Sequence, residues 1–290
     1  MQQADQEAIK EFLYQTITRQ APERAVAWLD KTLGQLAGGG SERPFFLSFS
    51  STPRFTGKDA LRWTEEDLQE AERLRPGWQP RSWTIDQTTR VLLTLSLPHQ
   101  GEEDFVRILN LVFSAAEVGE LIALYLSLPV LPYPERHRER AAEGVRSNIT
   151  AAFEAVALRN PYPADYLSEE AWNQLVMKAI FVNAPIGQIS GLDKRANERL
   201  ARTLTDFAHE RCAAGRPVPP GLWRLVGPFA DEQGLPDCER LFRSDDPVQH
   251  QAAALACAMS SFPAARELAE KRPDLQEKIT SGELNWETVE

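Results

Sequence analysis

Residues 136–163 read RHRERAAEGVRSNITAAFEAVALRNPYP, and this stretch decides the fold class. Its apolar positions recur at spacings of three and four, which is the period of one helix face. The positions on that face are Val145, Ile149, Ala152, Phe153 and Val156. Pro161 and Pro163 then stop the helix, because proline lacks a backbone N–H and restricts the residue before it. The stretch predicts a long helix over about residues 136–158 and a sharp turn after it.

The same pattern extends outward in both directions. Amphipathic helix patterns cover residues 5–19 and 22–37, and strand patterns are scarce. Further helix patterns cover residues 235–243, 247–260 and 263–271. Short turns that carry proline join successive helices, which favours antiparallel helix pairs. Residues 241–256 resemble the turn and second helix of a HEAT-type repeat. We therefore predict an all-α fold of stacked antiparallel helix pairs, an α-solenoid or HEAT-like superhelical array.

No composition shift marks a domain boundary, so we predict a single helical domain over residues 1–290. Residues 1–40 form a candidate N-terminal helical hairpin. Residues 41–57 are rich in phenylalanine and are interrupted by Pro53 and Gly57. We interpret them as an aromatic, extended loop laid on the helices, with a short strand as the alternative.

Composition and charge exclude several functional classes. The 290 residues carry a formal net charge of −10, which opposes binding to nucleic acid or to an anionic membrane surface. The polar N-terminus does not resemble a signal peptide, and no apolar run reaches the roughly 20 residues of a membrane span. The three cysteines form no CxxC pair. We expect a cytoplasmic protein without cofactor, and the sequence leaves its oligomeric state open.

Lys178 is the most unusual residue of a helix predicted over residues 169–182. The second half of that helix is apolar almost all round, which is typical of a buried helix. A buried ammonium group needs a partner or loses its proton. One interpretation is a structural ion pair, or a lysine whose amine reaches the surface. The other is a cation in a ligand cleft or an activated amine. The candidate partners are Glu154, Asp193, Asp206 and Glu210.

A second group of polar residues follows a helix predicted over residues 193–213. Arginines at 195, 199 and 202 share a stripe with Asp206 and His209. This stripe is a solvated face with pairs such as Arg202–Asp206, or the wall of a polar pocket. An acid–base or metal cluster is the third interpretation. The four histidines do not pair at ligand spacing, so we expect no metal site and no catalytic motif.

Several short motifs between about residues 85 and 265 resemble the EboA family. They are Arg146-Ser147-Asn148, Asn160-Pro161-Tyr162-Pro163, Trp172-Asn173-Gln174 with Lys178-Ala179, Gly191-Leu192-Asp193 with Arg195 and Asn197, and Ala208-His209-Glu210-Arg211. At Cys212 the family pattern favours tryptophan. The resemblance implies a bacterial protein encoded in an operon for metabolite traffic, beside proteins that resemble a membrane prenyltransferase, a hydrolase and a sugar isomerase.

From the residues and the resemblance together we expect a non-catalytic helical binding or scaffold protein. It would assist the processing or export of a natural-product precursor by holding a small metabolite or operon-encoded partner proteins. The alternative is an enzyme that acts on a small metabolite through a polar cleft around Lys178. The candidate cleft residues are Arg146, Asn148, Glu154, Tyr162, Trp172, Asn173, Lys178, Asp193, Arg195, Asn197, Asp206, His209 and Glu210.

Overall fold

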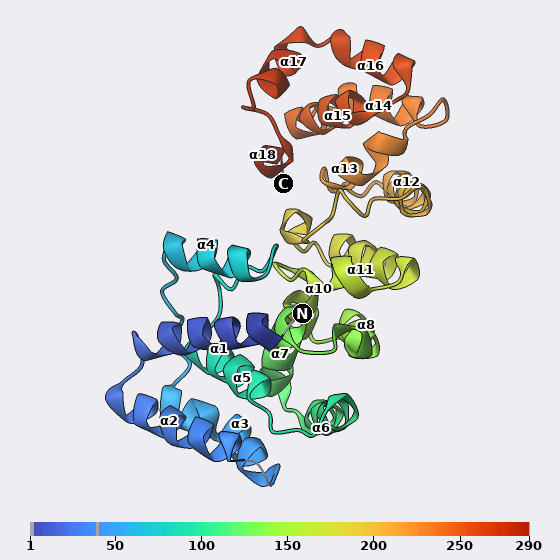
Figure 1. The fold of residues 1–290 in the computed structure, drawn as a ribbon. Coiled ribbons are helices and arrows are strands. Elements are labelled where there is room, and N and C mark those ends of the chain that lie inside the picture. Colours follow the sequence, from blue (N-terminus) through green and yellow to red (C-terminus); the bar gives the residue numbers. More distant parts are fainter. Residues whose placement is uncertain (1–2, 39–40, 290) are drawn as a thin grey trace. The chain divides into compact units, whose positions relative to one another are not determined.

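The computed structural model describes residues 3–38 and 41–289, and it confirms the all-α prediction (Figure 1). Within these ranges the backbone forms eighteen α-helices and no strand. The chain divides into two compact units, Met1–Ala171 and Trp172–Glu290. The predictions of a single domain and of a HEAT-like array are not tested by these features and stay predictions.

The first unit contains ten α-helices in its described residues and two short 3₁₀ turns. Its α-helices are α1 (Gln3–Thr18), α2 (Glu23–Ala37), α3 (Arg43–Thr56), α4 (Glu65–Leu74), α5 (Ile85–Leu95), α6 (Glu102–Ala115), α7 (Val118–Ser127), α8 (Arg138–Arg146), α9 (Thr150–Ala157) and α10 (Tyr162–Tyr166). The 3₁₀ turns are η1 (Leu128–Val130) and η2 (Pro134–His137).

Helix α5 lies at the centre of this unit, where it contacts α1, α3 and α7. All of its residues except Gln87 are buried, including three threonines. The threonine hydroxyls are satisfied within the helix: Oγ1 of Thr89 donates to the carbonyl of Ile85 at 2.7 Å, and that of Thr94 to Arg90 at 2.8 Å. Polar residues can therefore occupy this core without leaving an unpaired donor.

The interpretation of residues 41–57 as an extended loop is wrong, because Arg43–Thr56 forms helix α3. Pro44 occupies the first turn, where a missing N–H costs nothing. The buried residues of α3 follow a helical period, and they are Phe45, Ser48, Phe49, Thr52 and Thr56. Gly57 ends the helix with a φ of 78°. Phe45 and Phe49 therefore lie on the buried face of α3, which packs on α2 and α5, whereas Phe55 is 39% exposed.

The single long helix predicted over residues 136–158 is also wrong, because α8 and α9 are separated at residues 147–149. The Ser147 hydroxyl accepts a hydrogen bond from the Ile149 N–H at 3.1 Å, which favours a turn there. A Cβ placed on Gly144 would lie 2.5 Å from Cγ2 of Val156. In one continuous helix these two residues would be about 18 Å apart. The chain must turn for the two helices to pack, and Ile149 becomes exposed at the turn.

His137 is a buried histidine of the first unit, and it predicts a pH dependence of stability. Burial lowers the pKa of the His137 imidazole, and its Nε2 lies 2.8 Å from the Pro132 carbonyl. The folded protein therefore holds His137 neutral, whereas the unfolded chain takes up a proton below about pH 6.5. The contribution of the neutral His137 imidazole to the free energy of unfolding is therefore present above about pH 6.5 and is lost as the pH falls below that value.

We expect His137→Gln to reduce the loss of unfolding free energy between pH 7.5 and pH 5.5, because glutamine can donate to the same carbonyl without titrating. Urea unfolding at the two pH values measures this difference. An unchanged pH dependence in the variant would contradict the assignment to His137.

The second unit contains α11 (Glu169–Phe181), whose first turn precedes Trp172, and seven further α-helices in its described residues. These are α12 (Glu198–Ala213), α13 (Leu222–Val226), α14 (Leu235–Phe242), α15 (Pro247–Met259), α16 (Pro263–Glu270), α17 (Pro273–Thr280) and α18 (Trp286–Val289). Two 3₁₀ turns, η3 (Ile186–Gln188) and η4 (Gly227–Phe229), connect them.

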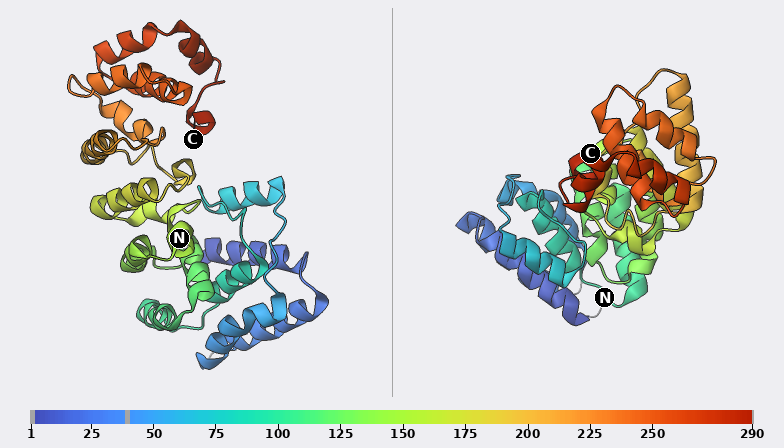
Figure 2. Two further views of the ribbon diagram at one scale, coloured as in Figure 1. Left: turned by 180° about the vertical axis from the view of Figure 1, so that it is seen from behind. Right: turned by 90° about the horizontal axis from the view of Figure 1, so that it is seen from above.

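Helix α15 is the centre of the second unit and contacts α13, α14, α16, α17 and α18 (Figures 1 and 2). Its alanines at 252–254 and 256 are buried with Cys257, so neighbouring helices approach its backbone closely. Cys257 packs with Cys238, Ala265 and Ala269 into a small apolar cluster between α14, α15 and α16. Small side chains on α15 thus let several short helices share one core.

Candidate functional site

Helix α11 carries Lys178, the residue on which the catalytic alternative depends. Leu175, Val176 and Ala179 are buried as predicted, but Phe181 is 74% exposed. The prediction of a helix end buried all round is therefore wrong. Lys178 is half-buried, and this burial lowers the pKa of its amine. The lysine lies at the edge of the helix core rather than sealed inside it.

Four of the candidate cleft residues come together between α11 and α12. The amides of Asn173 and Asn197 bond each other reciprocally, with Nδ2–Oδ1 distances of 3.2 and 2.8 Å. The Arg195 guanidinium lies 4.9 Å from the ring centre of Trp172. Asn197 also caps α12, because its Oδ1 accepts from the Leu200 N–H at 2.9 Å. This cluster holds the turn before α12 against α11.

The predicted stripe along residues 193–213 is only partly formed, because α12 begins at Glu198 and Arg195 lies in the turn before it. The Arg202–Asp206 pair is replaced by a contact between Arg202 and Glu198. Either pair joins residues one turn apart on an exposed helix face, where an ion pair contributes a few tenths of a kcal/mol. Asp206 and Glu210 are both exposed.

Asp193 and His209 find partners that the sequence did not indicate. Arg224 on α13 makes two hydrogen bonds to the Asp193 carboxylate. Its Nε donates to Oδ1 at 2.7 Å, and its Nη2 donates to Oδ2 at 2.8 Å. Nε2 of His209 lies 2.9 Å from each carboxylate oxygen of Asp237 on α14. Asp237 is 5% exposed, and it also accepts from Nη2 of Arg240 at 2.8 Å. These pairs connect α12 to α14 and the turn before α12 to α13.

The four remaining candidate residues belong to the first unit. Arg146, Asn148 and Glu154 are exposed, and Glu154 lines a small cavity of about 220 Å³. Tyr162 is fully buried, its hydroxyl donates to the Pro134 carbonyl at 2.5 Å, and burial raises its pKa. Tyr162 is therefore a structural residue of the first unit. Among the described residues of this unit, no cleft brings these four side chains together.

A cavity of about 550 Å³ lies in the second unit where α11 ends. Its described lining is mostly apolar and includes none of the thirteen candidate residues. It is formed by Ile180, Asn183, Ala184, Pro185, Ile186, Gly187, Gln188, Pro219, Pro220, Gly221, Glu287 and Val289. The sequence analysis identified none of these residues as part of a site. The sequence signal that could have indicated this pocket is the proline in both loops that line it, because proline fixes the backbone of segments outside the helices.

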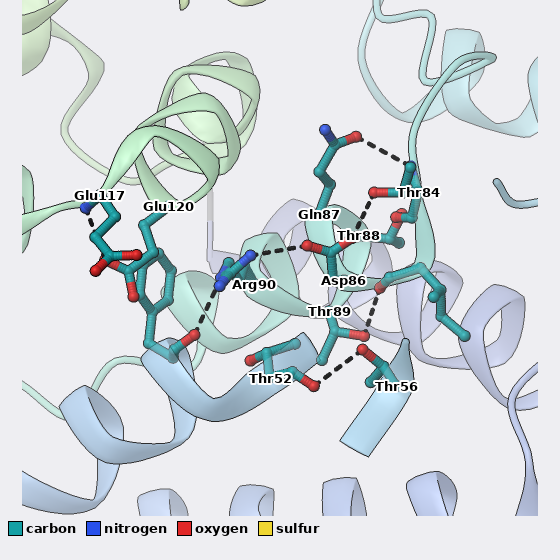
Figure 3. Close-up of polar contacts among 12 residues, drawn as sticks. Thr52, Thr56, Thr84, Asp86, Gln87, Thr88, Thr89, Arg90, Glu117 and Glu120 are labelled. Carbon is teal, nitrogen blue, oxygen red and sulfur yellow. Dashed lines mark hydrogen bonds and ion pairs between the residues drawn. The ribbon is translucent and has the colours of Figure 1, made fainter. Parts of the chain in front are cut away.

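Sequence reasoning also missed a buried ion pair within α5 of the first unit (Figure 3). Nη1 of Arg90 lies 2.8 Å from Oδ2 of Asp86, and both residues are about 95% buried. Thr84 occupies the N-cap position of α5, and its hydroxyl donates to Asp86 at 2.6 Å.

The second contact of Arg90 explains why an arginine is tolerated here. Its Nε donates to the carbonyl of Phe49 at 3.0 Å. In α3 that carbonyl would normally bond the N–H four residues on, but this residue is Pro53, which has none. Burial lowers the pKa of Arg90, while the nearby carboxylates of Asp86, Glu120 and Glu117 oppose that shift. Arg90 thus satisfies a carbonyl that Pro53 leaves open.

These observations define an all-α protein whose candidate residues are exposed or take part in structural contacts, and whose second unit has a preformed apolar pocket. In the described part of the chain, no group of three or more His, Cys, Asp or Glu side chains could hold a metal ion. Among the described helices, none combines the length and apolarity needed to cross a membrane.

The chain belongs to the EboA family, because the model of the family described as metabolite traffic protein EboA matches residues 9–227. This confirms the resemblance seen in the sequence. No curated protein and no solved structure matches the chain. The family description places the protein in metabolite traffic.

Proposed function

We propose that this protein is a non-catalytic, cytoplasmic binding protein that holds a small metabolite while a natural-product precursor is processed or exported. The observation that carries the proposal is the apolar pocket at the end of α11. Its volume of about 550 Å³ lies in the range typical of small-molecule sites. Partner proteins encoded in the same operon would deliver or receive the metabolite.

The lining of the pocket indicates the chemistry of its ligand. Isoleucine and proline side chains supply most of the surface, and Asn183, Gln188 and Glu287 supply the polar groups. Such a lining suits a molecule with an apolar body and one or two hydroxyl or amine groups.

The pairing of the candidate acid–base groups favours binding over catalysis. Asp193 is held by Arg224 and His209 by Asp237, so each has a structural role. Lys178 remains the residue of the alternative proposal, an enzyme acting through an amine whose pKa is lowered by burial. The two proposals predict different consequences of mutating Lys178 and of filling the pocket.

We expect Ala184→Trp to abolish product export in a deletion strain complemented with the variant, because the indole would occupy the pocket. Ala213→Trp is the matched control, since Ala213 is exposed on α12 and lies outside the pocket lining. Both variants should keep the melting temperature of the wild-type protein. If the Ala184→Trp strain exports as much product as the control strain, the proposal that this pocket holds the metabolite is contradicted.

Lys178→Met separates the two proposals in the same strain. A binding protein should retain export, because Lys178 is not part of the described pocket lining. Abolished export with an unchanged melting temperature, together with normal export by Ala184→Trp, would establish the catalytic alternative instead.

A further inference from the structure

A second cavity of the second unit, of about 680 Å³, lies between the end of α12, helix α14 and the start of α15. Three arginines line it: Arg216, Arg240 and Arg243. They come from three different segments, namely the turn after α12, the last turn of α14 and the residue that ends α14. One acidic residue, Asp246, also lines the cavity, so the formal charge of its lining is three minus one, or +2.

The guanidinium group of Arg240 is held in place from two sides. Its Nη2 is bonded to the buried carboxylate of Asp237, which His209 also contacts. Its Nη1 donates to Sγ of Cys212. Burial lowers the pKa of Arg240, but the hydrogen bonds with Asp237 and Cys212 outweigh burial and raise it overall. Arg240 is therefore a fixed positive charge at the wall of the cavity.

The other charged groups of the lining do not neutralise the positive charge of the cavity. The carboxylate of Asp246 accepts from the Val248 N–H at 2.9 Å and so caps α15. Arg243 contacts Glu239 at 3.1 Å, but both side chains are largely exposed, and such a pair contributes little. Arg216 is exposed at the rim, after the left-handed Gly215 that ends the turn of α12. Two exposed arginines can thus reorient toward a bound anion.

The rest of the lining is apolar or accepts hydrogen bonds. Pro217, Val218 and Leu241 provide apolar surface. The side-chain oxygen of Gln249 is buried and has no hydrogen-bond partner among the described residues. That oxygen is not exposed to the cavity, so the cavity offers positive charge and apolar contact.

We propose that this cavity binds an organic phosphate with an apolar body. A phosphomonoester carries a charge of about −1.5 to −2 at neutral pH, which matches a lining of +2 better than a monocarboxylate does. The planar guanidinium group of arginine can donate two parallel hydrogen bonds to two oxygens of one phosphate. This site is separate from the apolar pocket at the end of α11, and none of its described lining residues is shared with that pocket.

Cys212 provides a direct test, because it is exposed and lines the cavity, whereas Cys238 and Cys257 are buried. The experiment measures the rate at which iodoacetamide alkylates Cys212 in the full chain, with hexyl phosphate as the probe. At about ten times its Kd, hexyl phosphate should slow alkylation by about tenfold, since occupancy follows mass action. Hexanoate at the same concentration should protect far less.

The double variant Arg216→Ala/Arg243→Ala should lose the protection, because each charged hydrogen bond contributes about tenfold or more to affinity. Arg202→Ala is the matched control, since Arg202 is an exposed arginine of α12 outside the described lining. It should be protected like the wild-type protein. Cys212→Ser should still bind hexyl phosphate in a calorimeter.

Three results would overturn the proposal. The first is no protection of the wild-type protein by hexyl phosphate. The second is equal protection by hexanoate, which would show an apolar site without phosphate selectivity. The third is protection that persists in Arg216→Ala/Arg243→Ala.

Discussion

Arg90→Met is expected to lower the free energy of unfolding by about 3–5 kcal/mol, because it leaves one member of a buried ion pair behind. The carboxylate of Asp86 would stay about 95% buried with the Thr84 hydroxyl as its remaining side-chain donor. The Phe49 carbonyl, which has no helical partner because residue 53 is proline, would lose its donor as well. Urea unfolding of the variant and the wild-type protein measures the difference.

The proline offers a sharper test of the same contact. In the Arg90→Met background, Pro53→Ala restores an N–H four residues after Phe49. We expect it to recover about 1 kcal/mol, the net contribution of one hydrogen bond. Arg54→Ala in the same background is the control, since Arg54 is exposed on the same turn of α3. Equal effects of the two alanines would show that the Phe49 carbonyl is not what Arg90 satisfies.

The sequence predicted helices α14, α15 and α16 of the second unit closely, but it placed the start of α12 at residue 193 rather than at Glu198. The patterns over residues 235–243, 247–260 and 263–271 agree with α14, α15 and α16 to within one residue at each end. Proline at the start of α15 and of α16 fixes these boundaries locally. Local sequence suffices when caps and prolines, rather than tertiary contacts, determine where a helix begins.

The sequence predictions failed where tertiary contacts determine whether the backbone is helical. Residues 136–158 have an unbroken helical period, yet the packing of Gly144 on Val156 requires a turn that periodicity does not reveal. In residues 41–57, Pro53 suggested a loop, but its missing N–H is compensated by Arg90, 37 residues further along the chain. A proline inside a helix is tolerated when another side chain satisfies the open carbonyl.

The candidate site shows the same limit. The sequence grouped thirteen polar residues by unusual composition, and the structure brings four of them together as a structural cluster at the start of α12. The two cavities of the second unit are formed by loops and helix ends, such as residues 183–188 and 216–218. Cavities depend on how elements pack, so no local pattern in those loops predicted them.

Gly227→Ala is expected to destabilise the second unit by about 1–3 kcal/mol, the usual cost of inserting a methyl group into a packed core. Gly227 has helical dihedrals, with φ −51° and ψ −46°, so an alanine fits its backbone. The obstacle is steric: a Cβ there would lie 2.6 Å from both Cα and O of Ala256. These are backbone atoms of the central helix α15, which cannot turn aside as a side chain could. Thermal or urea unfolding of the purified variant measures the loss.

Gly234→Ala is the matched control for this contact. Gly234 also has right-handed helical dihedrals, with φ −82° and ψ −17°, but the nearest atom to its added Cβ would be 3.6 Å away. Alanine there reduces the freedom of the unfolded chain, so we expect Gly234→Ala to stabilise by about 0.4–1 kcal/mol. The two substitutions should therefore have opposite signs. Equal effects would mean that chain entropy, rather than the approach of η4 to α15, determines the result at Gly227.

The same substitution links the stability of the second unit to its pocket. Residue 227 is the last residue matched by the family model, and α15 lies beyond the match. Helix α15 contacts α18, which supplies Glu287 and Val289 to the apolar pocket. A methyl group at Gly227 should therefore displace α15 and weaken product export at temperatures where the variant remains folded. Gly234→Ala should leave export unchanged. Normal export by Gly227→Ala despite lowered stability would show that the pocket does not depend on the position of α15.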